Sequence, residues 1–436
     1  MEISLEQGRG TVNFTLPREK ILEVVQGKKV PKLSHEKILD IIDRGIRSSL
    51  PKDIGGKTCA VIIPDDTRLW ARGDLFVPRI IKTLSNMGIA FNRIKIIIAL
   101  GTHEDISPDK FASLAGAYCT ENVTIINSAG LDNSRLVNIG TTYKGTPLLV
   151  TKEAWEADQI IIFGGILHHM LAGFGGGRKY ILPGIAGEAS IRHNHSLAIR
   201  KDGSPHPLVR QGKLWGNPVN EDLMDGANLF LKNKTACYVA LAANGTGELF
   251  YAAVGDLHDT FMEGCRKLNH ACCVHVPEKA DFVLFSAGGH RADGQLYQAT
   301  KALFNAVNLV KEGGQILFVA GCEKGEGNLD FAEMLNEFRK NPEKLGQRLV
   351  SDFDMPSYVA FRVIDILNRF QVTLSSELGR QRTRDLGFEY ADNMDHYLKN
   401  LNGQGYVIPF AENILPQVKK KFSPRPPRKK TGASDG

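Results

Sequence analysis

The chain contains no hydrophobic run of the roughly 18 residues that a membrane span requires. Its N-terminal residues also lack the apolar stretch of a secretory signal. The seven cysteines form no CxxC pair and no zinc-ligand spacing, and an odd number of them is typical of reduced thiols rather than of a disulfide framework. We therefore expect a cytoplasmic protein with no membrane partner.

An excess of positive charge is absent from the body of the chain. The formal net charge is +6, but the stretch 419–436 accounts for that whole excess. A nucleic-acid-binding protein carries its basic patch on the folded domain, so we predict no nucleic-acid partner. The SPRPPRKK composition near the C-terminus predicts a basic disordered tail over residues 416–436.

Short apolar runs alternate with amphipathic stretches along the rest of the chain. Apolar runs predict strands at 59–66, 95–103, 122–129, 159–167, 280–290 and 313–321, and helical spacing predicts helices at 75–89, 295–310, 329–340 and 355–369. This alternation favours an α/β fold made of two α/β domains with mainly parallel sheets. We expect residues 1–275 to form the first domain and residues 276–415 the second, with an active-site cleft between them.

Polar and titratable residues follow three of the predicted strands. Open parallel sheets bind ligands beyond the carboxyl ends of their strands, so these residues are expected to share one site. They are Asp65, Asp66, Thr67 and Arg68 after the first strand, Gly101, Thr102 and His103 after the second, and His168 and His169 after the run 159–167.

The segment 168–195 combines a glycine-rich loop, a lysine and several histidines. Its glycines could present backbone amides to a phosphate, or could form a flexible loop beside a solvated Lys179. The loop is not a Walker motif, because an arginine precedes the lysine and a tyrosine follows it. His193 and His195 would point in different directions from a helix, so one of them could bind a metal. Neutral imidazole suits both nickel binding and proton transfer.

A second-domain segment offers groups that could hold a carboxylate. Gln298 and Lys301 are three residues apart, so they share one face of the predicted helix. A solvated helix face is the alternative interpretation of this pair. Arg68 adds a planar guanidinium suited to a carboxylate or a phosphate.

Five blocks in this order resemble the lactate racemase family, whose members use a nickel pincer nucleotide. The blocks are DDTR (65–68), GTH (101–103), HHMLAGFGGGRKYILPG (168–184), His195, and YQATK (297–301). The N-terminal QGRGTVNFTLP is also similar to the opening strand of the family. The resemblance extends over roughly residues 7–415, which is all of the chain except the predicted tail.

The resemblance implies a cofactor, Ni(II)-pyridinium-3,5-bisthiocarboxylic acid mononucleotide, bonded covalently to Lys179, with His195 as a nickel ligand. It implies that His103 and His169 transfer protons. The implied cofactor contacts are Asp65, Asp66, Thr67, Arg68 and Pro183, and the implied substrate contacts are Arg68, Tyr297, Gln298 and Lys301. The implied partners are a small 2-hydroxy acid and the enzymes that synthesise the cofactor.

The sequence departs from the family pattern in two places. His168 directly precedes His169, and the spacing favours His169 as the catalytic residue. The family's lactate enzymes carry a second-domain tryptophan, whereas this chain has none beyond Trp215 and offers Phe353, Tyr358 and Phe361 in the range 352–361. The substrate is therefore expected to be lactate-like or larger, and Arg291 or Asp293 could favour a more polar acid.

Three functions follow as hypotheses. The first is a racemase or epimerase that inverts the 2-carbon of a 2-hydroxy acid by hydride transfer to and from the cofactor, with two histidines as acid and base. The second is a nucleotide- or phosphate-binding protein without redox chemistry. The third is a zinc hydrolase, which the absence of an HExxH pattern disfavours.

Overall fold

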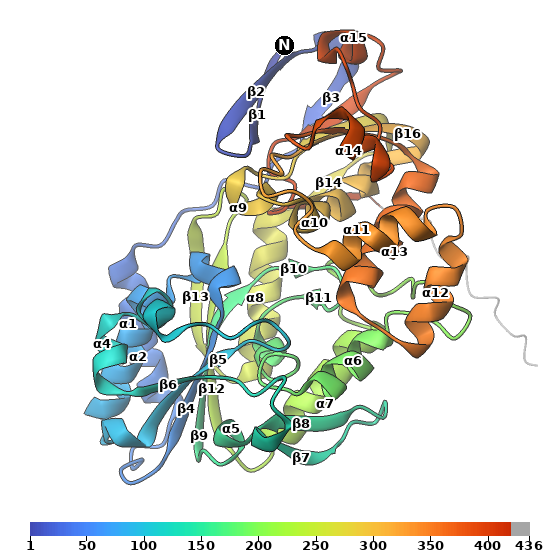
Figure 1. The fold of residues 1–436 in the computed structure, drawn as a ribbon. Coiled ribbons are helices and arrows are strands. Elements are labelled where there is room, and N and C mark those ends of the chain that lie inside the picture. The colour runs from blue at the N-terminus through green and yellow to red at the C-terminus, as the bar shows by residue number, and fades with distance from the viewer. Residues whose placement is uncertain (420–436) are drawn as a thin grey trace, which may run out of the picture.

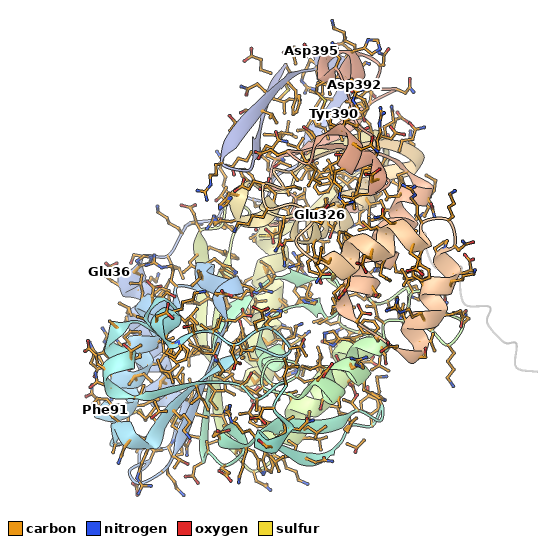
Figure 2. All side chains as sticks on the ribbon, in the orientation of Figure 1. Glu36, Phe91, Glu326, Tyr390, Asp392 and Asp395 are labelled. Atoms are coloured by element: carbon orange, nitrogen blue, oxygen red, sulfur yellow. The ribbon has the colours of Figure 1, made fainter. Side chains whose placement is uncertain are left out.

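The computed structural model describes residues 1–419 of the chain. It contains two α/β domains, each built around a mainly parallel sheet, as predicted (Figure 1). Figure 2 places Phe91, in the first domain, and Asp395, in the second, at opposite ends of the molecule. Residues 420–436, most of the predicted tail, lie outside the described residues. Within the described part, no helix is both long and apolar enough to cross a bilayer.

The first domain is built on a six-stranded sheet in the order β13-β12-β9-β4-β5-β6, with only the β12–β13 pair antiparallel. Every residue of its central strands β4 and β9 is buried, because helices cover both faces of the sheet. Alternate residues of β4 join different cores: Val61 packs with the core of α1 and α2, and Ile62 with that of α7 and α8. The strands are β4 (Cys59–Pro64), β5 (Ile94–Ala99), β6 (Thr124–Asn127), β9 (Gln159–Ile166), β12 (Thr235–Ala243) and β13 (Leu249–Gly255).

The strand order reverses direction between β4 and β9. The chain runs from β4 outward to β5 and β6, and then returns to place β9 and β12 on the other side of β4. Ligands of such sheets bind in the crevice at the carboxyl ends of the strands that flank the reversal. The helices of this domain are α1 (His35–Ser49), α2 (Gly73–Asn86), α3 (Phe111–Ala115), α4 (Ala117–Asn122), α5 (Lys152–Trp155), α6 (Glu188–Ser196), α7 (Pro218–Leu231) and α8 (Leu257–Cys272).

The second domain has a five-stranded sheet in the order β17-β16-β15-β18-β3, with every neighbouring pair parallel. Its order reverses between β15 and β18, which creates a second crevice of the same kind. The strands are β15 (Ala280–Ser286), β16 (Val310–Val319), β17 (Gln371–Ser375), β18 (Gly405–Ile408) and β3 (Ile21–Val24). The helices are α9 (His290–Asp293), α10 (Leu296–Ala306), α11 (Leu329–Phe338), α12 (Pro342–Ser351), α13 (Met355–Arg369), α14 (Gly379–Asp385) and α15 (Met394–Lys399).

The N-terminal strands pack with the second sheet, although the predicted first domain of 1–275 includes them, and the domain limits stay predictions. Strand β3 pairs with β18, and the hairpin β1 (Glu2–Gln7) and β2 (Gly10–Thr15) lies beside α15 (Figure 1). Leu5 and Leu16 share a core with Phe282, Leu284 and Val407 of the second sheet. Pairing between the two ends of a chain leaves no local pattern, and for this reason composition and periodicity did not predict it.

Two further boundaries differ from the prediction, and two short strand pairs complete the fold. The expected helix 295–310 ends at Ala306, and the strand after it already begins at Val310. The predicted tail begins too early, because β19 (Leu415–Val418) pairs with β14 (Cys273–Val276). The other short pairs are β7 (Leu136–Thr141) with β8 (Pro147–Thr151), and β10 (His168–His169) with β11 (Gly173–Phe174).

We predict that Leu16→Ala destabilises the second domain. Leu16 is fully buried in the core that the N-terminal residues share with Val407, so the truncation should lower the free energy of unfolding by about 2–5 kcal/mol. Hydrogen exchange should accelerate in β18 before it does in β4. Leu329→Ala is the matched control, because Leu329 is 76% exposed. Equal effects of both substitutions, or faster exchange in β4 alone, would contradict this placement of the N-terminus.

Candidate active site

His103 and Asp65 form a hydrogen-bonded pair beyond the carboxyl ends of β5 and β4. Nδ1 of His103 lies 2.5 Å from Oδ2 of Asp65, and Oδ1 of Asp65 accepts hydrogen bonds from the backbone N–H and the hydroxyl of Thr67. Burial alone would raise the pKa of Asp65, but the bonds from His103 and Thr67 hold it below its ordinary value. The ionised carboxylate keeps a hydrogen on Nδ1 of His103. Nε2 of this ring, whose side chain is 62% exposed, is left free to accept a proton.

The ring hydrogen of His169 lies on the other nitrogen from that of His103. Its Nδ1 accepts hydrogen bonds from the backbone N–H groups of Leu171 and Ala172, at 3.1 and 3.3 Å. In the neutral ring the hydrogen is therefore on Nε2, the atom that lies 3.2 Å from Nζ of Lys179. Burial, with the positive charge of Lys179 next in size, sets the pKa of His169 well below its ordinary value. His169 thus directs an N–H toward the lysine, whereas His103 directs a lone pair outward.

His168 faces away from the lysine, although it is the next residue in the chain. Its Nε2 lies 2.9 Å from Oδ1 of Asn269 on α8, and its ring packs against that of Phe174. Burial lowers the pKa of His168 to about 4. Because neighbouring residues of a strand point to opposite faces, only one of these two histidines can face the lysine. The sequence left this choice open, and the geometry favours His169.

Lys179 is a half-buried lysine surrounded by positively charged side chains. Burial is the main cause that lowers its pKa from 10.5 to about 7, and the charges of Arg178, Arg68 and Lys301 act in the same direction. Near neutral pH much of this amine is therefore uncharged and able to form a covalent bond. The same positive charges would attract an anionic ligand.

The fully buried Arg178 organises the glycine-rich loop. Its guanidinium donates hydrogen bonds to the carbonyl oxygens of Ala172, Phe174 and Gly176, and to Oδ1 of Asn220 on α7. It also lies 4.0 Å from the centre of the Phe261 ring, a favourable cation–π geometry. Because these partners come from both sides of the loop, Arg178 fixes the backbone that carries Lys179.

The loop glycines are required by packing against the protein itself. A side chain at Gly173, where φ is +74°, would meet the carbonyl oxygen of Lys213 at 2.1 Å. One at Gly176, where φ is +91°, would meet the carbonyl oxygen of Gly165 at 2.6 Å. The backbone amide of Gly175 is already used, because it donates to the carbonyl of Leu167. This loop therefore differs from a cradle of free amides around a phosphate.

His195 is a buried imidazole suited to bind a metal. It is 6% exposed, and its Nδ1 has no hydrogen-bond partner among the described residues. Burial, followed by the charge of Lys179, lowers its pKa to about 3, so the ring is neutral and its nitrogen lone pair is available. His193 turns the other way and contacts the hydroxyl of Thr146, as their spacing on a helix predicted. The ring of Phe353 from the second domain packs edge-on against His195.

The second domain brings Lys301 toward the same charges. Burial lowers the pKa of Lys301 to about 8, and the charge of Arg68 adds to this effect. Nζ of Lys301 donates a hydrogen bond to Oε1 of Gln298, so these two share a helix face as predicted. Tyr297 packs against Phe331 within the second domain. The predicted cleft and the substrate role of these residues stay predictions.

The remaining predicted contacts lie on loops around the first-domain crevice. Pro183 lies against Gly101, which precedes the turn that carries His103. Asp66 and Thr67 are exposed in the turn after β4, and Arg68 is partly exposed beside them. Among residues 1–419, no group of three or more His, Cys, Asp and Glu side chains is arranged to hold a metal ion. A metal held by His195 would therefore need most of its ligands from a bound cofactor.

Comparison with known proteins identifies the family. The model of the lactate racemase N-terminal domain matches residues 7–205, and the model of the lactate racemase C-terminal domain matches residues 276–405. The chain belongs to the lactate racemase family. Two curated members of the family, both named lactate racemase, are similar to it. That of Thermoanaerobacterium thermosaccharolyticum is 26% identical over 433 residues, which are 96% of this chain and 99% of that protein. That of Lactiplantibacillus plantarum is 29% identical over 320 residues, which are 73% of each protein.

Two solved structures share the fold of this chain. The lactate racemase apoprotein of T. thermosaccharolyticum superposes with a TM-score of 0.82 at 24% identity, covering 96% of this chain and all of that one. A Thermotoga maritima protein superposes with a TM-score of 0.65 at 16% identity, covering 91% of this chain and all of that one.

Sequence reasoning missed the residues that support this lactate racemase family site. Asn220 and Asn269 hold Arg178 and His168 from distant helices, and no local motif marks either of them. Arg178 was noted only as a departure from the Walker pattern. A charged residue between two buried glycine-rich turns is a usable signal, because burying a cation requires several acceptors nearby.

We predict that Arg178→Met lowers the free energy of unfolding by about 3 kcal/mol or more. The substitution leaves three backbone carbonyls and the Asn220 amide without their buried donor. Urea titration measures the loss. Arg44→Met is the matched control, since its ion pair with Asp40 is exposed and worth about 0.5 kcal/mol or less. A loss no larger than that of the control would refute the organising role of Arg178.

We predict that Lys179→Met stabilises the unloaded protein in a pH-dependent way. The unfolded chain binds a proton at its ordinary pKa of 10.5 and the folded chain at about 7, so charging Lys179 opposes folding. The gain on substitution should be largest at pH 7 and below, and should disappear as the pH rises toward 10.5. Thermal denaturation across this range measures it, with the exposed Lys37→Met as control. A gain that does not change with pH would contradict the lowered pKa.

Proposed function

We propose that this protein is an isomerase that inverts the 2-carbon of a 2-hydroxy acid, lactate-like or larger, using a nickel pincer nucleotide. The observation that supports it most directly is a pair of nitrogen groups near His169. These are the amine of Lys179, which is nucleophilic near neutral pH, and the neutral imidazole of His195. Family membership supplies the reaction class.

The residues present fit the cofactor that the family implies. Lys179 would form the covalent bond to it, and His195 would coordinate the metal through a lone pair that no protein group occupies. Neutral nitrogen and sulfur ligands suit nickel. Arg68 and the turn from Asp65 to Thr67 lie where they could contact the nucleotide. When bound, this group supplies a reversible acceptor for the hydride of the 2-carbon.

The side chains of this protein would bind the substrate and move its proton. Arg68 and Lys301 would hold the carboxylate, because both are cationic and the charge of Arg68 acts on Lys301. His103 would take the hydroxyl proton on Nε2, and Asp65 would stabilise the resulting imidazolium. His169 would return a proton from the opposite side, and for this it would have to carry hydrogens on both ring nitrogens, because a neutral imidazole is too weak an acid to give up its N–H. A planar 2-keto acid, held by its carboxylate, could then expose either face.

Two other functions are less compatible with the site. A phosphate-binding protein would use free amides in the glycine-rich loop, but the amides of Gly175 and Lys179 donate to backbone carbonyls within the protein. A zinc hydrolase usually holds its metal with three protein ligands, and residues 1–419 contain no such group.

The decisive experiment is co-expression with the cofactor-synthesising enzymes. We predict one nickel per chain, and a mass increase that maps to Lys179 and is lost in Lys179→Ala. The loaded protein should racemise at least one acid in a panel of 2-hydroxy acids. Chiral chromatography measures the loss of the starting enantiomer. Protein with no nickel and no adduct at Lys179 would refute the proposal.

Variants of three histidines separate the proton-transfer roles from structural ones. His103→Gln and His169→Gln should load nickel normally but lower kcat by about 10²–10⁴-fold. His168→Gln is the matched control, since His168 contacts Asn269 rather than the lysine. It should keep most of its activity, and a loss as large as that of His169→Gln would reverse the assignment.

A further inference from the structure

Asp222, on α7, is a fully buried carboxylate whose hydrogen-bond partners are all uncharged. Oδ1 accepts a hydrogen bond from the hydroxyl of Thr142. Oδ2 accepts one from the hydroxyl of Thr146 at 2.6 Å and another from Nδ2 of Asn194 at 2.8 Å. Burying a carboxylate without a cation costs free energy, which these hydrogen bonds must offset. The carboxylate therefore holds its donors firmly in place.

Asn194 joins this carboxylate to α6, the helix that carries His195. Nδ2 of Asn194 also donates to the carbonyl of Val219 on α7, at 3.2 Å. Because both of these partners are acceptors, the amide nitrogen of Asn194, and not its oxygen, must face α7. Asn194 is fully buried and directly precedes His195 in the chain. The contact therefore ties the backbone beside the proposed metal ligand to a second helix.

His193 is attached to the same carboxylate through Thr146, which lies in the turn between β7 and β8. The hydroxyl of Thr146 has one hydrogen, which it donates to Asp222. It must therefore accept a hydrogen from Nδ1 of His193, which lies 2.8 Å away. The two residues that precede His195 are thus both connected to Asp222, one directly and the other through a hydroxyl.

Helix α6 is attached to the rest of the first domain along one face. Ser190 lies four residues before Asn194, so these two side chains share a face of the helix. Oγ of Ser190 donates to the carbonyl of Pro147 at 2.6 Å and accepts from the N–H of Leu149 at 2.9 Å. Successive helical residues are about 100° apart around the axis. With this face fixed, the side chain of His195 leaves the helix in one defined direction.

We propose that Asp222 is a positioning residue, which holds α6 in the rotation that directs His195 at the metal. This inference rests on the proposed function, because it takes His195 as the nickel ligand. Without the carboxylate, Asn194 and Thr146 lose the acceptor that they share, and α6 is free to turn about its axis. Such a turn moves the imidazole of His195, whereas Lys179 stays in place on a different loop. Removing groups that orient a metal ligand typically lowers metal affinity by about 10–100-fold.

The test follows nickel in protein that the cofactor-synthesising enzymes have loaded. Asp222→Asn replaces one acceptor oxygen by a donor of the same size, and Asn194→Ala removes the donor on α6. Both variants should lose nickel to a chelator about tenfold or more faster than the parent does. The absorption band of the bound metal should shift in both, because its histidine ligand is displaced. The mass of the adduct at Lys179 should stay unchanged.

Thr142→Val is the matched control. It removes a hydrogen bond from the same carboxylate at nearly constant side-chain size, but leaves the oxygen that Asn194 uses untouched. This variant should unfold more easily than the parent and yet lose nickel at the parent rate. Equally fast nickel loss in Thr142→Val and Asp222→Asn would overturn the proposal, because the effect would then follow stability. Parent rates in Asp222→Asn would overturn it as well.

A measurement on the unloaded protein distinguishes failure of this inference from failure of the proposed function. If the parent takes up no nickel and carries no adduct, the proposed function fails. NMR spectra of unloaded protein with isotope-labelled histidine then report on His195 by itself, and His195→Gln identifies its signal. Asp222→Asn should shift or split that signal, whereas Thr142→Val should leave it as in the parent. An unchanged His195 signal in Asp222→Asn would overturn the positioning role.

Discussion

The buried guanidinium of Arg178 is the constraint on which the site depends. It has no carboxylate partner among the described residues, and backbone carbonyls together with Asn220 compensate its loss of water. Burial lowers the pKa of Arg178 to about 10, so it still carries its charge at neutral pH. The glycine-rich loop therefore wraps around the guanidinium of Arg178. The next residue in the chain, Lys179, takes a defined position beside this positive charge. The order of the loop and part of the lowered pKa of Lys179 thus come from the same residue.

Charge and hydrogen bonding divide the site into complementary parts. After burial, the charge of Arg68 lowers the pKa of Lys179 and of Lys301, and all three cations lower the pKa of His169, so the site favours neutral nitrogen atoms and anionic ligands. His103 lies at the outer edge, where Asp65 can stabilise its charged form. This asymmetry comes from the partner of each Nδ1, which is a pair of backbone amides for His169 and the Asp65 carboxylate for His103.

Much of the fold could be predicted from the sequence because parallel strands that are buried on both faces require continuous apolar runs. The runs that became β4, β9 and β15 are of this kind, and the polar residues that follow the first two lie at the expected crevice. The direction in which individual side chains point could not be predicted in the same way. The choice between His168 and His169 depends on Asn269, which is distant in sequence. Such relations arise only when separate segments pack together.

The pairing of the N-terminal strand β3 with β18, near the C-terminus, has a consequence for synthesis on the ribosome. The first sheet and its helices come from one continuous stretch, so they can fold while the rest of the chain is still being made. The second sheet needs β18, which at about 5–20 residues per second emerges roughly twenty seconds or more after β3. During that interval the N-terminal strand has exposed, unpaired backbone groups, which other chains could bind. Nascent-chain chaperones would therefore be expected to protect the beginning of this protein for longer than its middle.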